Sequence, residues 1–137
     1  MKEDTVLQQF NKIYGKNIME NCINFLEKKD GEKFKNYLNG NKLSICNMFI
    51  AKTYFFRNYC ENLFPWLNKC LEYCNKNNIF NDKNIRLPIF LAERYTSYWF
   101  SENVNTKYLS FARLGQFLLS DNINKFINPI KIPFTFR

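Results

Sequence analysis

The sequence has no histidine among its 137 residues and contains only four glycines and four prolines. Without histidine, these residues cannot form a Ser-His-Asp or Cys-His catalytic arrangement, or a zinc site that uses histidine. The glycines are scattered, so they form neither a phosphate-binding loop nor a dinucleotide-binding motif. No stretch approaches the ~18 uncharged apolar residues of a membrane span. These absences disfavour self-contained catalysis and predict a soluble protein.

Cysteine usage indicates a reducing compartment. The five cysteines are an odd number, and no apolar signal-peptide segment follows the charged N-terminus. Both features favour free thiols in the cytoplasm. Cys70 and Cys74 are four residues apart and would share one face of a helix, but no second pair completes a tetrahedral metal site. We therefore expect them to be buried as small hydrophobic residues.

The composition predicts one folded domain with a basic surface. Hydrophobic residues make up 46% and aromatic residues 18%, which is enough for a buried core, and the net charge is +8. Fifteen of the 20 cations are lysine and 21 residues are asparagine, as an AT-rich coding sequence tends to produce, so most of this charge is expected on a solvated surface. The alternative is attraction to polyanions such as nucleic acid, sugar nucleotides or anionic lipid. The chain has no uninterrupted Lys/Arg block, so nothing supports nucleic-acid binding.

Hydrophobic periodicity predicts a mainly α protein with one or two short β-strands. Apolar residues at helical spacing predict helices over residues 4–14, 17–29, 32–38, 53–75 and 87–101. Gly15 and Gly31 are expected breaks, and Pro65 either joins two helices or lies within one. The nine-residue uncharged run Leu43–Ala51 is expected to be a strand. Further strand, helical-turn and extended segments are expected at 107–112, 114–119 and 130–137, all within a single domain 1–137.

Three local groups of residues could carry chemistry. Asn47 lies inside the apolar run, where its amide needs a hydrogen bond, either to neighbouring backbone or to a ligand. Arg86 and Glu93 are two helical turns apart, and Arg94 follows directly. A carboxylate beside two guanidiniums stays ionised, so it can act as a base towards a hydroxyl or bind sugar hydroxyls. The alternative is a structural ion pair.

The third group is a run of aromatic residues, Tyr95, Tyr98, Trp99 and Phe100. Four rings within six positions are not expected to face a single core. Packing accounts for most of them, and the remainder could stack on a sugar ring or contact a membrane interface.

Taken together, these residues resemble a bacterial family of sugar transferases from capsule, exopolysaccharide and lipopolysaccharide gene clusters, whose domain was long catalogued as of unknown function. The resemblance rests on the Asn-Met-Phe-Ile segment from Asn47, the following helix with Tyr59 and Leu63-Phe64, and Arg86 spaced seven residues before Glu93-Arg94. It covers about residues 45–100, with a weaker similarity over 5–40.

The resemblance implies the helical, C-terminal part of a GT-A-like glycosyltransferase, on the acceptor side. The family's N-terminal His-Tyr-Arg-Arg-Tyr signature and nucleotide-binding sheet have no counterpart here, and the four Asp form no Asp-x-Asp pair. The implied function is part of an enzyme that moves a sugar from a nucleotide-sugar donor to a surface-polysaccharide acceptor, and that is not active from this chain alone. The implied location is the cytoplasm, at the inner face of the inner membrane.

The resemblance also implies roles for particular residues. Glu93 is the candidate base, Arg86 and Arg94 position it or meet diphosphate charge, and Asn47 supplies a hydrogen bond. Trp99, with Tyr98 and surface lysines, is the candidate contact for a glycan or lipid-linked acceptor and for peripheral membrane contact. No metal site is expected in this chain, and Mn²⁺ or Mg²⁺ would enter only with the complete enzyme.

The alternative function is a non-catalytic helical module, or truncated remnant, that binds a partner chain. If a second half normally packs on this one, apolar surface should be exposed on Leu43–Ala51 or on the aromatic helix. The isolated chain should then self-associate or pair with that half.

Overall fold

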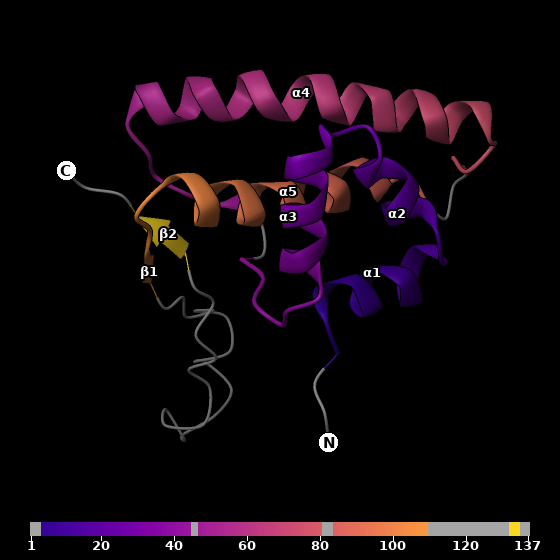
Figure 1. Ribbon diagram of the computed structural model, residues 1–137, viewed down its shortest axis with the longest axis horizontal. Coiled ribbons are helices and arrows are strands. Elements are labelled where there is room, and N and C mark those ends of the chain that lie inside the picture. The colour runs from indigo at the N-terminus through magenta and orange to yellow at the C-terminus, as the bar shows by residue number, and fades with distance from the viewer. Residues whose placement is uncertain (1–3, 45–46, 81–83, 110–131, 135–137) are drawn as a thin grey trace, which may run out of the picture.

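The computed structural model describes residues 4–44, 47–80, 84–109 and 132–134. The fold is mainly helical, as the sequence predicted, and its two strands are short (Figure 1). The elements are α1 (Val6–Tyr14), α2 (Ile18–Ile23), α3 (Lys28–Leu38), α4 (Thr53–Lys76), α5 (Leu87–Asn103), β1 (Lys107–Leu109) and β2 (Ile132–Phe134).

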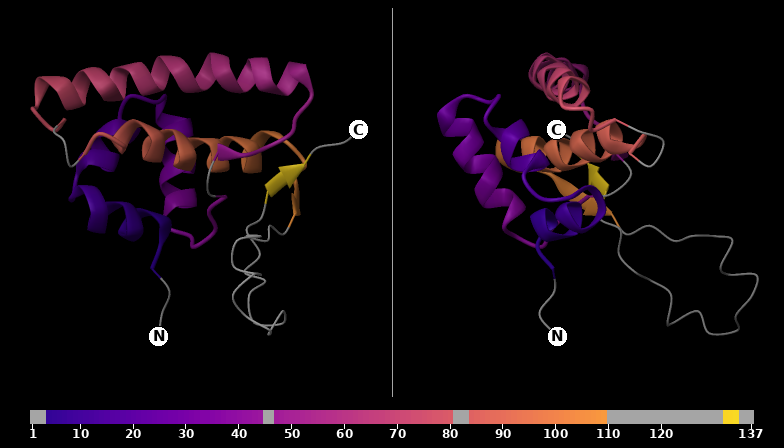
Figure 2. Two further views of the ribbon diagram at one scale, coloured as in Figure 1. Left: turned by 180° about the vertical axis from the view of Figure 1, so that it is seen from behind. Right: turned by 90° about the vertical axis from the view of Figure 1, so that its right-hand side faces the viewer.

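Helix α5 lies at the centre of the fold. The long helix α4 runs along one side of it, and α1 and α3 contact it from other sides (Figures 1 and 2). All four rings of the aromatic run, Tyr95, Tyr98, Trp99 and Phe100, are buried. The expectation that they could not all face a core is therefore wrong. It assumed a helix with one covered face, whereas a helix covered on several sides can be apolar all round.

Helix α1 confirms the predicted first helix and begins with a capping box. The Thr5 hydroxyl accepts a hydrogen bond from the Gln8 backbone N–H at 3.1 Å, and the Gln8 side chain accepts one from the Thr5 N–H at 2.9 Å. The helix ends at Gly15, whose φ of 94° few other residues adopt without strain.

Gly31 does not break the chain, contrary to the prediction from sequence. It is buried inside α3, and a Cβ atom at this position would lie 3.4 Å from both Cγ2 and the carbonyl oxygen of Ile23. The absence of a side chain thus lets α3 approach α2 closely. The predicted helices 17–29 and 32–38 are accordingly wrong in their boundaries, because α2 ends at Ile23 and α3 begins at Lys28.

Helix α4 is one continuous helix of 24 residues that contains Pro65. Pro65 is exposed, so water can bond the carbonyl that its missing N–H leaves free. The opposite side of the helix is buried through Tyr59, Leu63, Trp66, Cys70 and Cys74. The Trp66 Nε1–H donates to the Cys22 carbonyl oxygen at 2.8 Å, which ties α4 to α2.

The described residues of Leu43–Ala51 do not form the predicted strand. Asn47 has a φ of 50°, which interrupts an extended run. After it the side chains alternate: the Phe49 ring packs against Phe100 at 4.5 Å between centroids, while Met48 and Ile50 are exposed.

The two strands pair antiparallel, with Lys107 opposite Phe134. Strand structure is therefore confirmed at 107–109 and 132–134. The rest of the predicted 107–112 strand, the 114–119 turn and the other residues of the 130–137 tail lie outside the described residues.

The thiols in the described part of the chain are free, as expected. Cys22, Cys70 and Cys74 are buried, whereas Cys60 is partly exposed. Contact with the Cys70 thiol, together with burial, raises the pKa of Cys22, and the contact with Cys74 opposes this rise. Contact with the Cys22 thiol, together with burial, raises the pKa of Cys74. Cys46 lies outside the described residues.

The buried tyrosines predict a loss of stability at alkaline pH. Burial, together with the nearby charges of Asp30 and Glu102, raises the pKa of Tyr98 to about 12, from an ordinary value of 10.0. Between these values the unfolded chain releases a proton that the folded chain keeps, so stability falls as pH rises from about 10 towards 12. Urea unfolding midpoints measured from pH 9 upwards should show this fall, and Tyr98→Phe should make it shallower. A Tyr98→Phe variant with the wild-type slope would contradict the assignment.

Candidate functional site

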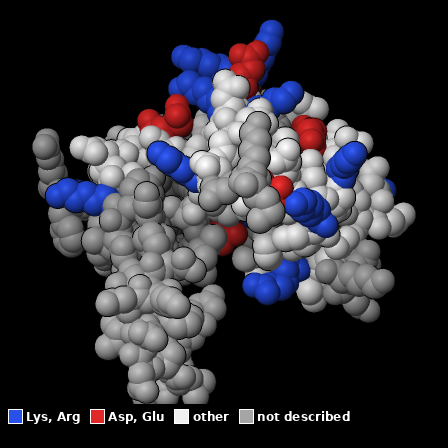
Figure 3. All heavy atoms as spheres, turned by 90° about the horizontal axis from the view of Figure 1, so that it is seen from below, with Lys and Arg blue, Asp and Glu red and all other residues white. Residues whose placement is uncertain are grey.

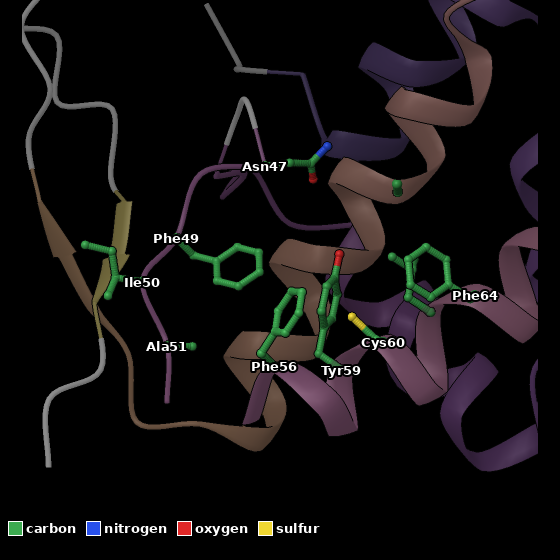
Figure 4. Close-up of a pocket in the computed structure, with 10 residues that line it drawn as sticks. Asn47, Phe49, Ile50, Ala51, Phe56, Tyr59, Cys60 and Phe64 are labelled. Atoms are coloured by element: carbon green, nitrogen blue, oxygen red, sulfur yellow. The ribbon is translucent and has the colours of Figure 1, made fainter. Parts of the chain in front are cut away.

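A largely apolar pocket of about 600 Å³ opens between the 47–51 segment and the first half of α4, with one wall residue from α5 (Figure 4). It is lined by Asn47, Phe49, Ile50, Ala51, Phe56, Tyr59, Cys60, Leu63, Phe64 and Ala92. The pocket therefore combines aromatic walls with a single amide, the arrangement of sites that bind a ligand by its apolar face and orient it by a few polar atoms.

Asn47, one of the residues that line this pocket, carries an unusual polar atom. Its Oδ1 is buried and accepts no hydrogen bond from the described residues. A buried acceptor without a donor costs about 1–3 kcal/mol, so a ligand hydroxyl or N–H that reaches it would be stabilised. Of the two roles that the sequence left open, this oxygen favours contact with a ligand over a bond to neighbouring backbone.

Tyr59 forms a fixed, uncharged wall of the pocket. Its hydroxyl lies 2.6 Å from Thr96 Oγ1, and Thr96 Oγ1 lies 2.7 Å from the Ala92 carbonyl oxygen. Either hydroxyl can donate in the Tyr59–Thr96 pair, and the short contact holds the Tyr59 ring in place. Burial raises the pKa of Tyr59, and the hydrogen bond to Thr96 opposes this only in part.

Arg94 is a buried cation on α5, with only 2% of its side chain exposed. Its Nη1 donates to the Phe90 carbonyl at 3.2 Å and lies 3.4 Å from Glu93 Oε2. The guanidinium also lies over the rings of Phe10 and Phe90, at 5.2 and 5.3 Å from their centroids. Burial lowers the pKa of Arg94, and the Glu93 carboxylate opposes this shift. Arg94 is thus placed to hold Glu93 and is shielded from a solvent-borne diphosphate.

Arg86 occupies a different position, at the start of α5, and is exposed. Its guanidinium lies 5.6 Å from the centroid of the Phe90 ring. The pKa of Tyr14, at the end of α1, is raised by burial, and the charges of Arg86 and Arg94 oppose that rise. The structure therefore brings Arg86, Glu93 and Arg94 into one electrostatic neighbourhood and adds Tyr14, which the sequence did not single out.

Trp99 does not lie on a surface that a ligand can reach. It is 5% exposed and packs against Tyr59 and Phe100, at 5.6 and 5.1 Å between ring centroids. The stacking role expected for Trp99, and the docking role expected for Trp99 with Tyr98, are corrected accordingly: both rings belong to the core.

A family model described as a domain of unknown function, DUF4422, matches residues 1–105. The chain belongs to the DUF4422 family. The matched part contains helices α1 to α5, the pocket and the Arg86–Glu93–Arg94 group, and ends just before β1. No curated protein matches the chain, and no solved structure matches it.

The charges of this DUF4422 chain are distributed rather than gathered on the face shown in Figure 3, where acidic side chains lie among the basic ones. Within the described part of the chain, no group of three or more His, Cys, Asp or Glu side chains could hold a metal ion. Over the same residues, no helix combines the length and the apolar character that crossing a membrane requires.

Two site features went unnoticed in the sequence. Cys60 lines the pocket, and Thr96 fixes the Tyr59 hydroxyl. Both lie at ordinary helical spacings that predict only packing, so no local signal could have identified them.

Proposed function

We propose that this DUF4422 chain is the acceptor-side part of a nucleotide-sugar glycosyltransferase, and that its pocket binds a sugar of the acceptor. The observation that carries the proposal is the Oδ1 atom of Asn47, a residue of the aromatic pocket, which is buried and accepts no hydrogen bond from the part of the chain that the structure describes. A sugar ring offers an apolar C–H face to aromatic rings and hydroxyl donors to an amide oxygen. The resemblance of the Asn47 segment and of the Arg86–Glu93–Arg94 spacing to surface-polysaccharide sugar transferases supports the same class.

In this proposal Glu93, which lies on α5 outside the set of residues that line the pocket, is the base that activates the acceptor hydroxyl. Arg94 is a positioning residue that lies 3.4 Å from its carboxylate. Arg86, which is exposed, meets the diphosphate of the donor. The donor-binding part comes from outside these residues, and the assembled enzyme works in the cytoplasm at the inner face of the inner membrane. The described residues contain no group of three or more His, Cys, Asp or Glu side chains that could hold a metal ion, and the proposal assigns no step in this chain to a metal.

The second candidate function is a non-catalytic helical module that binds a partner chain. It is favoured by exposed apolar side chains around the pocket: Met48, Ile50, Phe56 and Phe64. The expectation of exposed apolar surface is confirmed for the described part of the Leu43–Ala51 segment. On the aromatic helix, the rings of the 95–100 run are buried instead.

Calorimetry tests the proposed function. We expect acceptor oligosaccharides to bind the chain, and Asn47→Gly to weaken that binding about 10-fold through loss of one hydrogen bond. Glycine accommodates the φ of 50° at this position. Asn78→Gly is the matched control, because Asn78 has a φ of 52° and is exposed outside the pocket, and it should change the affinity less than about twofold.

The panel should include UDP-, GDP- and CMP-sugars with and without Mn²⁺ or Mg²⁺, for which the proposal expects no tight binding by this chain alone. Failure of every acceptor glycan to bind would contradict the proposal and favour the helical module. If wild type and Asn47→Gly bind the glycan equally well, the pocket is not the acceptor site.

A further inference from the structure

Exposed rings and exposed cations are close together in the sequence where α4 begins. We name this the 48–57 surface, and it consists of Met48, Ile50, Lys52, Tyr54, Phe56 and Arg57, all of which are exposed. The exposed fractions of Ile50, Tyr54 and Phe56 are 52%, 71% and 48%. Side chains of this kind are usually withdrawn from water, so their concentration within ten residues indicates a surface that becomes covered.

The charge of this region has one sign. From Lys42 to Cys60 the sequence contains three cations and no acidic residue. The first turn of α4 has no acidic side chain, and the first acid along the helix is Glu61. A surface of this kind attracts an anionic partner, and two copies of it placed face to face would bring Lys52 and Arg57 against their own like charges.

Rings flanked by Lys and Arg match the chemistry of a membrane interface. Tyrosine rings sit at the headgroup level, and long basic side chains bury their stems while their charges meet lipid phosphates. Each basic residue near an anionic membrane contributes about 1 kcal/mol. A duplex nucleic acid would use Lys52 and Arg57 but offers little to the apolar Met48 and Ile50 side chains.

We propose that the 48–57 surface docks this chain on an anionic lipid bilayer, with the Tyr54 and Phe56 rings at the headgroup level. Because Ile50 and Phe56 also line the pocket, docking places the pocket mouth beside the bilayer. This orientation rests on the exposure and charge of the 48–57 surface and does not depend on the proposed transferase activity. It also replaces Trp99 and Tyr98, which are buried, as the membrane contact.

Co-sedimentation with vesicles tests the proposal. We expect the chain to bind phosphatidylcholine vesicles that contain about 30 mol% phosphatidylglycerol, to bind pure phosphatidylcholine weakly, and to be released as salt rises. Lys52→Gln/Arg57→Gln should lower the partition coefficient about 10-fold or more, and Tyr54→Ser/Phe56→Ser should lower it about as much.

The matched controls lie on other elements. Lys28→Gln/Lys29→Gln removes the same charge at exposed positions of α3, and Ile13→Ser removes a side chain that is 56% exposed on α1. Both should change partitioning less than about twofold if the 48–57 surface makes the contact. Asn47→Gly should also leave partitioning into vesicles unchanged. The vesicle experiment can therefore succeed even if the glycan-binding experiment fails.

Three outcomes would overturn the proposal. One is no binding to the anionic vesicles, and another is an equal loss with Lys28→Gln/Lys29→Gln, which would show a diffuse charge effect. The third is a dimer in analytical ultracentrifugation that Tyr54→Ser/Phe56→Ser converts to monomer, because the surface would then be an interface between copies of the chain.

Discussion

Glu93→Gln is expected to lower kcat about 10² to 10⁴-fold in the transferase assembled with its donor-binding part, with little change in acceptor KM. Glutamine keeps the size of the side chain and a hydrogen-bond acceptor for Arg94, but it cannot take a proton from the acceptor hydroxyl. Rates of sugar transfer measured over a range of acceptor concentrations separate kcat from KM.

The control for this variant is Glu102→Gln on the same helix, where Glu102 is exposed and pairs with Lys33 at 3.5 Å. It should transfer sugar at nearly the wild-type rate. Full turnover by Glu93→Gln would end the assignment of Glu93 as the base. Urea unfolding gives the fraction of each variant that is folded. If the loss of turnover by Glu93→Gln equals its loss of folded protein, Glu93 has only a structural role as the ion-pair partner of Arg94.

Arg94→Met is expected to lower the free energy of unfolding by about 3 kcal/mol. Methionine fills the space between the Phe10 and Phe90 rings, but it removes the charged group that faces the Glu93 carboxylate and the side-chain donor to the Phe90 carbonyl. Urea unfolding followed by tryptophan fluorescence measures the loss, and an unchanged m-value would attribute it to the folded state.

Arg86→Met is the matched control, because Arg86 is the exposed cation at the start of the same helix. Its effect should stay within about 0.5 kcal/mol. The double variant Glu93→Gln/Arg94→Met should recover part of the stability, since it removes both charges of the pair together. If Arg94→Met were as stable as wild type, the buried guanidinium would have no role in holding Glu93.

Local signals predicted those parts of the fold that local interactions determine. Apolar residues at helical spacing, with Gly15 as a break, predicted the first helix, and the same spacing predicted a helix over 87–101, so α1 and α5 were both located from the sequence. Gly31 was wrongly predicted to be a break, because the reason for a glycine at this position is the close approach of Ile23 from another helix. The burial of the 95–100 rings depends on α5 being covered on several sides, which no periodicity within one helix can show.

The sequence also predicted only part of the candidate site. Asn47 was identified because a polar residue inside an apolar run needs a partner, and its oxygen is indeed buried. The strand assigned to its segment was wrong because an apolar run of nine residues does not reveal the left-handed conformation of Asn47. Trp99 was assigned to a ligand because ring type alone does not distinguish a core position from a stacking surface.

The most direct measurement is the rate at which iodoacetamide alkylates Cys60 in the presence of each acceptor glycan. Cys60 lines the pocket and is partly exposed, whereas Cys22, Cys70 and Cys74 are buried, so mass spectrometry can follow this thiol against them. A glycan bound in the pocket at about ten times its Kd should slow alkylation about 10-fold, and Asn47→Gly should weaken this protection. An alkylation rate that no glycan changes would contradict the account of the pocket as the acceptor site.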